Sequence, residues 1–197
     1  DTTFVHLFII EMTESRNSLH KYAMQFGTYM GLFWIFKFIL FPAGLRIPFL
    51  QLLFLVLTIA VPFLGYYYAR MFRNKVCGGS ISFFQAWVFT VFMYMFAALL
   101  TAVAHYVYFQ FIDHGFIVNY YLNLFEELKN MNNIGSMGDT FKQMEEAFMA
   151  LGNLTPIELT MQLISQNVLY GSFLAIPTAL FVMKKKKTNM DEHTIQP

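Results

Sequence analysis

The chain has 197 residues, of which 57% are hydrophobic, 19% aromatic and only 13% charged. Soluble domains carry roughly 45–50% apolar and about 25% charged residues, so this chain has too few charges to cover a water-facing surface, and a soluble enzyme is excluded. The apolar content also excludes a disordered chain. With one cysteine, Cys77, the chain has neither an internal disulfide nor a CxxC metal site. The composition therefore indicates an all-α membrane protein with several spans.

The N-terminal segment, residues 1–21, is expected to precede the first span without acting as a signal peptide. Its apolar run at 4–10 is too short to cross a bilayer, and no small-residue cleavage site follows it. The stretch that begins at Met12 resembles a natural start. Residues 1–11 are therefore either native or a non-native upstream extension, and the sequence leaves both open.

The first span is expected over about residues 26–41. Gly27 and Gly31 have the spacing that lets a neighbouring membrane helix approach closely, although two chance glycines would look the same. Lys37 lies near the far end of this span, where a lysine in hydrocarbon costs about 3 kcal/mol. We expect its long stem to snorkel to the interface, the alternative being a buried functional cation.

The second span is expected over residues 47–68, followed at once by a cluster of three cations, Arg70, Arg73 and Lys75. Cations beside a span mark the cytoplasmic side, and the tyrosines at 66–68 are typical of an interface belt. Cys77 lies in the next loop, where palmitoylation is one reading of the thiol. We favour the simpler reading, an incidental thiol.

The third span is expected to begin near Phe83, capped by Ser82, and to run to about Ile112. His105 and Asp113 near its end could hold a metal ion or relay a proton. They are eight positions apart, however, which places them about 80° off a common helix face. We therefore expect an interfacial histidine and a helix-terminal acid in water, with no metal, cofactor or catalytic residue in the chain.

The segment 113–155 is expected to be a loop on the outer side that contains an amphipathic helical pair. Between residues 113 and 160 there are seven acids and two bases, and two apolar stripes recur at helical spacing. The turn between the stripes is expected at 130–138. The two helices either fold as a hairpin or lie on the bilayer. Two acid pairs, Glu126-Glu127 and Glu145-Glu146, are read as solvated faces rather than as acid–base pairs.

The fourth span is expected to begin at the Thr155-Pro156-Ile157-Glu158 capping box and to run to Met183. Its first half is polar, and three of its side chains share a face that should look into the bundle: Gln162, Gln166 and Tyr170. A substrate cavity is one interpretation of these amides, and hydrogen bonds between helices are the other.

The positive charges predict the orientation of the four spans. Nine Lys and Arg residues fall on one side, at Arg16, Lys21, Arg70, Arg73, Lys75 and Lys184–Lys187, against Arg46, Lys129 and Lys142 on the other. This asymmetry places both termini in the cytoplasm and the acidic loop outside. The membrane domain then covers residues 22–187, and the tail 188–197 is expected to be disordered.

Several short pieces of the chain resemble a known family. They are Lys21-Tyr22-Ala23 through Gly27 and Gly31, the cations before Gly79-Ser80-Ile81-Ser82-Phe83, Gln85-Ala86, and Tyr108-Phe109-x-Phe111-Ile112-Asp113. The pattern resembles the Bacteroidota membrane family catalogued as domain of unknown function 4199, from about residue 18 to 187. The resemblance implies an uncharacterised multi-pass protein of the bacterial inner membrane. It also implies a possible partner, a glycosyltransferase that acts on lipid-linked sugars.

We expect a non-catalytic accessory or scaffold subunit whose partners are the lipid bilayer and another membrane protein, with no nucleic acid. The alternative is a small transporter or lipid-handling protein with a polar cavity between spans three and four. Such a cavity would lie near mid-bilayer and be lined by His105, Gln162, Gln166 and Asn167. A weaker third idea is a membrane enzyme that uses His105 and Asp113.

Overall fold

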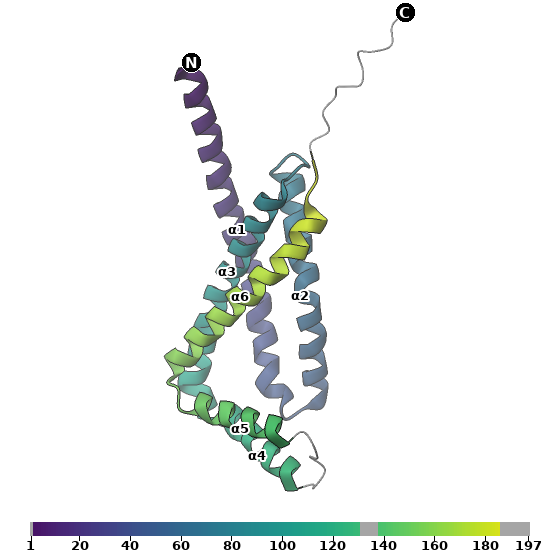
Figure 1. Ribbon diagram of the computed structural model, residues 1–197, viewed down its shortest axis with the longest axis vertical. Helices are drawn as coiled ribbons and strands as arrows, with labels where there is room; N and C mark the ends of the chain where they lie inside the picture. Colours follow the sequence, from purple (N-terminus) through teal and green to yellow (C-terminus); the bar gives the residue numbers. More distant parts are fainter. Residues whose placement is uncertain (1, 131–137, 186–197) are drawn as a thin grey trace, which may run out of the picture.

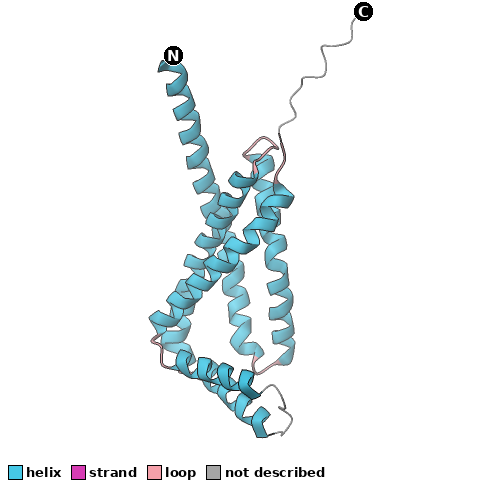
Figure 2. Ribbon diagram, viewed as in Figure 1, coloured by secondary structure: helices cyan, strands magenta, loops and turns pink. Residues whose placement is uncertain are grey.

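The computed structural model describes the backbone of residues 2–130 and 138–185, and the side chains of residues 18–129 and 138–185. Every named element in these ranges is helical, as predicted for an all-α protein (Figure 2). The elements are α1 (Thr2–Gly44), α2 (Pro48–Lys75), α3 (Phe83–Tyr108), the π turn η1 (Phe109–Asp113), α4 (Phe116–Asn130), α5 (Gly138–Gly152) and α6 (Pro156–Val182). The predicted turn at 130–138 and the tail at 188–197 lie largely or wholly outside the described residues.

Four helical segments are long and apolar enough to cross a membrane, and each contains or nearly coincides with a predicted span. They are Ser18–Gly44, Pro48–Lys75, Phe83–Asp113 and Pro156–Val182. In Figure 1 they form one bundle, and α4 and α5 lie across one of its ends. The start of α1 and the end of α6 lie at the opposite end (Figure 1). The start of the first span and the end of the fourth therefore lie on the same side, as an even number of spans requires.

The sequence signals at the helix starts act as expected. The Thr155 hydroxyl accepts a hydrogen bond from the Glu158 backbone N–H at 3.4 Å, and the Glu158 carboxylate accepts from the Thr155 N–H at 2.8 Å. At α3 the Ser82 hydroxyl accepts from the Gln85 N–H at 3.2 Å. These bonds satisfy backbone donors that the first helical turn leaves free. In a membrane this matters more, because hydrocarbon offers no replacement acceptor.

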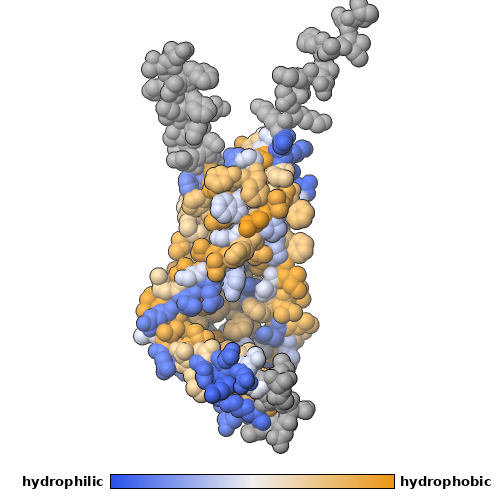
Figure 3. Space-filling model, viewed as in Figure 1, coloured by the Kyte–Doolittle hydropathy of each residue, from blue (hydrophilic) through white to orange (hydrophobic). Residues whose placement is uncertain are grey.

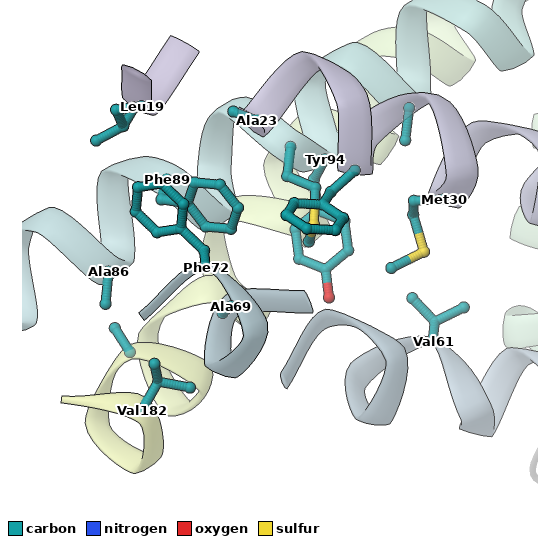
Figure 4. Close-up of a cluster of buried hydrophobic side chains, with 14 of the residues drawn as sticks. Leu19, Ala23, Met30, Val61, Ala69, Phe72, Ala86, Phe89, Tyr94 and Val182 are labelled. Carbon is teal, nitrogen blue, oxygen red and sulfur yellow. The ribbon is translucent and has the colours of Figure 1, made fainter. Parts of the chain in front are cut away.

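The half of the bundle away from α4 and α5 is tightly packed around aromatic side chains (Figure 4). Phe72 of α2 and Phe89 of α3 stack with ring centroids 4.0 Å apart and planes 3° apart. Tyr94 of α3 is fully buried, and its hydroxyl points toward α2. Since lipid is as apolar as these side chains, close packing is what holds the helices together here.

Glycines permit the closest helix contacts. A Cβ at Gly27 would lie 2.7 Å from the Met93 carbonyl oxygen, and one at Gly31 would lie 2.9 Å from a Leu100 methyl. The predicted Gly27/Gly31 contact face is thus confirmed, and its partner is α3. The sequence places Gly171 on a small-residue ridge of the fourth span but gives no signal for Gly65, and the two glycines form the slot for the Tyr94 ring.

The loop after α2 fastens the end of α6. Arg73 donates a hydrogen bond from Nη1 to the Val182 carbonyl at 2.9 Å, and Ile81 and Lys184 exchange two backbone hydrogen bonds of 3.0 Å. A cation at a helix C-terminus stabilises the exposed carbonyls. Arg73 therefore has a structural partner in addition to its place in the positive flank.

The segment between the third and fourth spans folds as a hairpin of α4 and α5, one of the two arrangements that the sequence allows. Tyr121 of α4 stacks on Phe148 of α5 at 4.7 Å, and Phe125 is buried between the helices. Lys129 forms an ion pair with Glu145 across the hairpin. Glu145 is therefore not simply a solvated acid, which corrects the expectation for that pair.

Candidate ligand cavity

The helices diverge toward the α4–α5 hairpin and leave a cavity of about 340 Å³ in that half of the bundle. Figure 3 shows the hollow just above the hairpin, on the face turned to the viewer. Every described element contributes to its lining, which consists of Trp34, Lys37, Phe38, Phe41, Phe54, Thr101, His105, Phe109, Asp113, Ile117, Val118, Phe148, Leu151, Leu159, Gln162, Leu163, Gln166 and Asn167. This volume is near the lower end of the range for small-molecule sites.

The cavity extends from the hairpin to the middle of the spans. Its deepest lining residues are Trp34 on α1, Thr101 on α3 and Asn167 on α6, each close to the centre of its helix. At 1.5 Å per residue, Trp34 lies about 15 Å from the end of α1 at Gly44. The sequence places the cavity near the middle of the spans. This holds only for the end of the cavity at Trp34, Thr101 and Asn167, farthest from the hairpin.

Aromatic side chains form most of the apolar wall. Phe38 of α1 packs edge-to-face against the rings of His105 and Tyr108, with ring centroids 4.3 Å and 5.2 Å apart. Phe148 and Leu151 of the hairpin close the outer end. Arg46, in the turn between α1 and α2, lies over the Phe116 ring at 4.6 Å and so joins the hairpin to the bundle.

Lys37 does not snorkel, which corrects the expectation from its sequence position. Its ammonium lies 5.4 Å from the centroid of the Phe54 ring, inside the cavity. Lys37 is seven residues before Gly44 and Phe54 is six residues after Pro48, so both lie about 10 Å from the ends of their helices. The side chain therefore reaches sideways toward α2, and its charge stays in the cavity, within the length of the spans.

The π turn brings His105 and Asp113 to the same cavity, whereas regular α-helix would place them on different faces. A π turn closes on i→i+5 and so holds one residue more than an α turn. That extra residue sets back everything after it by roughly 100°, which reduces the expected offset of roughly 80° to roughly 20°. The sequence offered no signal for the π turn, so the shared location was missed.

Asp113 is buried, not solvated, and it caps the next helix. Its two carboxylate oxygens accept backbone hydrogen bonds from Gly115 at 3.0 Å and from Ile117 at 3.3 Å. His114 between them has a φ of 45° and Gly115 a φ of 81°, so the chain reverses direction there. Because both oxygens serve the backbone, Asp113 positions α4 and is poorly placed to act as a base.

Two buried nitrogen atoms in the cavity lining have no hydrogen-bond partner among the described residues. They are Nε1 of Trp34, on a side chain 8% exposed, and Nδ1 of His105, on a side chain 6% exposed. A buried polar atom without a partner costs about 1–3 kcal/mol. His105 is therefore a core residue of the bundle, not the interfacial histidine that the sequence predicts.

The polar half of α6 divides between the cavity and the surface. Gln162, Gln166 and Asn167 line the cavity, as expected for the cavity interpretation, but Tyr170 is 61% exposed on the outside. The buried stripe of α6 is its small-residue edge, Gly171, Ala175 and Ala179. Within the described chain, no group of three or more His, Cys, Asp and Glu residues is placed to hold a metal ion.

Cys77 lies far from this cavity, in the loop after α2. It is partly buried, and this burial raises the pKa of its thiol above the usual value. A raised pKa means less thiolate at neutral pH and a less reactive sulfur.

The comparison with known proteins agrees with the extent of the bundle. A family model described as "Protein of unknown function (DUF4199)" matches residues 25–184, from the first span to the end of α6. No curated protein and no solved structure shows significant similarity to this chain. The match covers most of the sequence and all four spans, and the chain therefore belongs to the DUF4199 family of membrane-spanning proteins of unknown function.

Proposed function

We propose that this protein is a lipid-handling carrier that takes an amphiphilic molecule from the bilayer into the cavity between α1, α2, α3 and α6. The observation that carries the proposal is the cavity itself. A lysine and three amides face an aromatic-walled space in the part of the molecule that lipid surrounds. Ionisable and polar residues within spans are expensive and mark ligand pathways when they face a cavity.

The contrast between the two halves of the bundle supports this proposal over a purely structural role. The half of the bundle away from the hairpin is filled by large side chains such as Phe72, Phe89 and Tyr94. The half next to the hairpin also has large apolar residues, but they line the cavity instead of packing against one another across it. A scaffold held only by packing gains nothing from this space, because helices associate in lipid through van der Waals packing and a void provides none.

The position of the hollow suggests the route of entry. Figure 3 shows it open on one face of the bundle, bordered by both polar and apolar side chains, with the hairpin beneath. A molecule with a polar group and an apolar chain could pass sideways from lipid, since the lining offers amides for the group and aromatic side chains for the chain. The role is proposed as non-catalytic, because Asp113, the acid in the lining, is engaged by backbone N–H groups through both oxygens.

A pair of leucine variants on α6 tests the carrier role. Leu163→Trp adds bulk inside the cavity, and Leu169→Trp adds the same bulk on a side chain 54% exposed outside it. Each protein is purified from its native membranes in a mild detergent, and co-purifying lipophilic molecules are quantified by mass spectrometry. We expect one class of molecule at near-stoichiometric amounts in the wild type and Leu169→Trp, and its loss in Leu163→Trp. Equal lipid content in all three proteins would refute the carrier role.

We also propose that the protein resides in a bacterial inner membrane with both termini in the cytoplasm. Lys21, Arg70, Lys75 and Lys184 lie at one end of the bundle, and the hairpin with its acids lies at the other. In a Cys77→Ser background, single cysteines are introduced at Ser80 and Asn123 and treated with a membrane-impermeant maleimide in intact cells. We expect labelling at Asn123, on the hairpin, and none at Ser80. Labelling at Ser80 but not at Asn123 would reverse the orientation.

A second candidate function, an accessory subunit for a membrane glycosyltransferase, would use the apolar outer face of α2 as its docking surface. Leu52, Leu55, Ile59 and Phe63 recur at helical spacing and are 54–69% exposed. Such a face suits lipid or a second membrane protein equally in composition. Cross-linking from a photoreactive residue at Ile59 in native membranes decides between them: a discrete protein adduct supports the subunit role, and lipid adducts alone exclude it at this face.

A further inference from the structure

The cavity lining presents hydrogen-bond donors, and two of its buried nitrogen atoms have no partner among the residues that the structure describes. The Trp34 indole nitrogen can only donate, and the Lys37 ammonium has three N–H donors and no acceptor. Lys37 is placed over a ring, not beside a carboxylate. His105 adds a second nitrogen without a partner. Together the three side chains form a site that we call the donor cluster, Trp34, Lys37 and His105.

The acid in the lining does not complete this cluster. Both oxygens of Asp113 accept from backbone N–H groups at the start of α4, so its charge is already compensated by the helix end. The ion pair described in the hairpin joins Lys129 to Glu145, outside the cavity lining. The charge of Lys37 is therefore left without a matching carboxylate in the described lining.

The surroundings of the donor cluster define the other part of the ligand. Phe38, Phe41 and Phe54 stand around it, and Leu163 faces it from α6. A fully hydrated ion would have to shed water against these rings at high cost. An anionic group attached to an apolar chain satisfies both requirements, since the group meets the donors while the chain meets the aromatic wall.

Resting on the proposed carrier function, we propose that the ligand is a lipophilic acid whose carboxylate or phosphate oxygens bind the donor cluster of Trp34, Lys37 and His105. Charge-assisted hydrogen bonds are shorter and stronger than neutral ones. In this site they would also operate away from water, where electrostatic attraction is greater. The acidic group would then sit about 10–15 Å from the hairpin end of α1, since Lys37 and Trp34 lie seven and ten residues before Gly44.

The binding of cis-parinaric acid and of its methyl ester tests this assignment, because the pair differs in charge and shares its apolar chain. Both are titrated into the purified full-length protein in a non-ionic detergent and followed by their own fluorescence. We expect the acid to bind about 10- to 100-fold more tightly than the ester, as for hydrogen bonds to a charged group. Lys37→Met should remove this preference, whereas Lys142→Met, an exposed lysine on α5, should retain it.

Two further arms keep the test decisive. Trp34→Phe keeps the ring but removes the donor, so it should weaken acid binding and spare ester binding even if Lys37→Met fails to fold. Competition with dodecyl phosphate and dodecanoate distinguishes a phosphate from a carboxylate as the preferred group. Displacement by dodecyltrimethylammonium as effective as by either acid would overturn the inference.

The failure of this inference can be told apart from failure of the carrier role. Equal binding of acid and ester, both lost in Leu163→Trp, would leave a carrier without acid selectivity and overturn the donor-cluster assignment alone. Binding that Leu163→Trp leaves unchanged for both probes would place them outside the cavity and refute both proposals.

Discussion

The contact between Gly65 and Tyr94 gives the sharpest prediction about the stability of the bundle. A Cβ at position 65 would overlap the Tyr94 hydroxyl oxygen and lie 3.0 Å from Cζ, well inside the about 3.5–4.0 Å of an optimal non-bonded contact. Overpacking of this kind costs about 1–3 kcal/mol. The better helix propensity of alanine returns about 1 kcal/mol. Because the clash is severe, we expect Gly65→Ala to lower the free energy of unfolding by about 2 kcal/mol.

A second substitution should relieve this cost. Tyr94→Phe removes the hydroxyl, so the nearest ring carbon is left at the 3.0 Å of the Cζ atom. That hydroxyl is buried without a partner among the described residues, so Tyr94→Phe alone should be neutral or stabilising by about 1 kcal/mol. In the Tyr94→Phe background, Gly65→Ala should therefore lose most of its effect, which is a coupling of about 1–2 kcal/mol.

Equilibrium unfolding by SDS in mixed micelles measures these differences, followed by tryptophan fluorescence and far-UV circular dichroism. Trp34 reports on this region, since its ring stacks on Tyr94 with centroids 5.8 Å apart. Gly152→Ala is the matched control, because its added methyl meets only the tip of Val118, at 3.1 Å. Additive effects of Gly65→Ala and Tyr94→Phe, or a stabilising Gly65→Ala, would show that the helices do not meet through this slot.

Three further predictions concern the outer segment and the loop after α2. Asp113→Ala should weaken the start of α4 by about 1 kcal/mol, measured as faster amide hydrogen exchange throughout α4; exchange unchanged there would contradict the capping role. Removal of the Lys129–Glu145 pair by Lys129→Met should cost less than about 1 kcal/mol, because the pair is exposed and screened; a larger loss in SDS unfolding, insensitive to salt, would contradict this. Since burial raises the pKa of Cys77, its thiolate forms at higher pH than that of a free thiol. The rate of maleimide labelling should thus rise with pH around a midpoint above about 8.5, and a midpoint at or below that of a free thiol would refute the effect of burial.

Local signals determined the helices of this protein well. The Thr155–Glu158 capping box with Pro156 and the Ser82 cap mark the starts of α6 and α3 within one or two residues of those observed. The glycines at 27 and 31 predicted a contact face, and the structure supplies its partner, α3. These features depend on residues three or four positions apart, and so they can be read along the chain.

The candidate site could be predicted only in part. The alternative interpretation of the sequence places Gln162, Gln166 and Asn167 in a cavity with His105, and the structure shows these residues in its lining. Trp34 and the floor supplied by Phe148 were missed, because an aromatic residue on a helix looks the same whether it faces lipid, a neighbouring helix or a cavity. The position of Lys37 near the end of a span predicts the interface, whereas its ammonium lies over the Phe54 ring of α2.

Hydropathy, helical periodicity and helix caps are properties of neighbouring residues, and they were enough to predict four membrane spans with amphipathic helices between the last two. Where the bundle is filled and where it is hollow became visible only once the helices were placed in space. That outcome depends on how whole helices diverge, on the ring of Tyr94 between two glycines, and on the π turn that rotates Asp113 into line with His105. Each of these is a relation between distant segments, and a one-dimensional pattern carries no record of it.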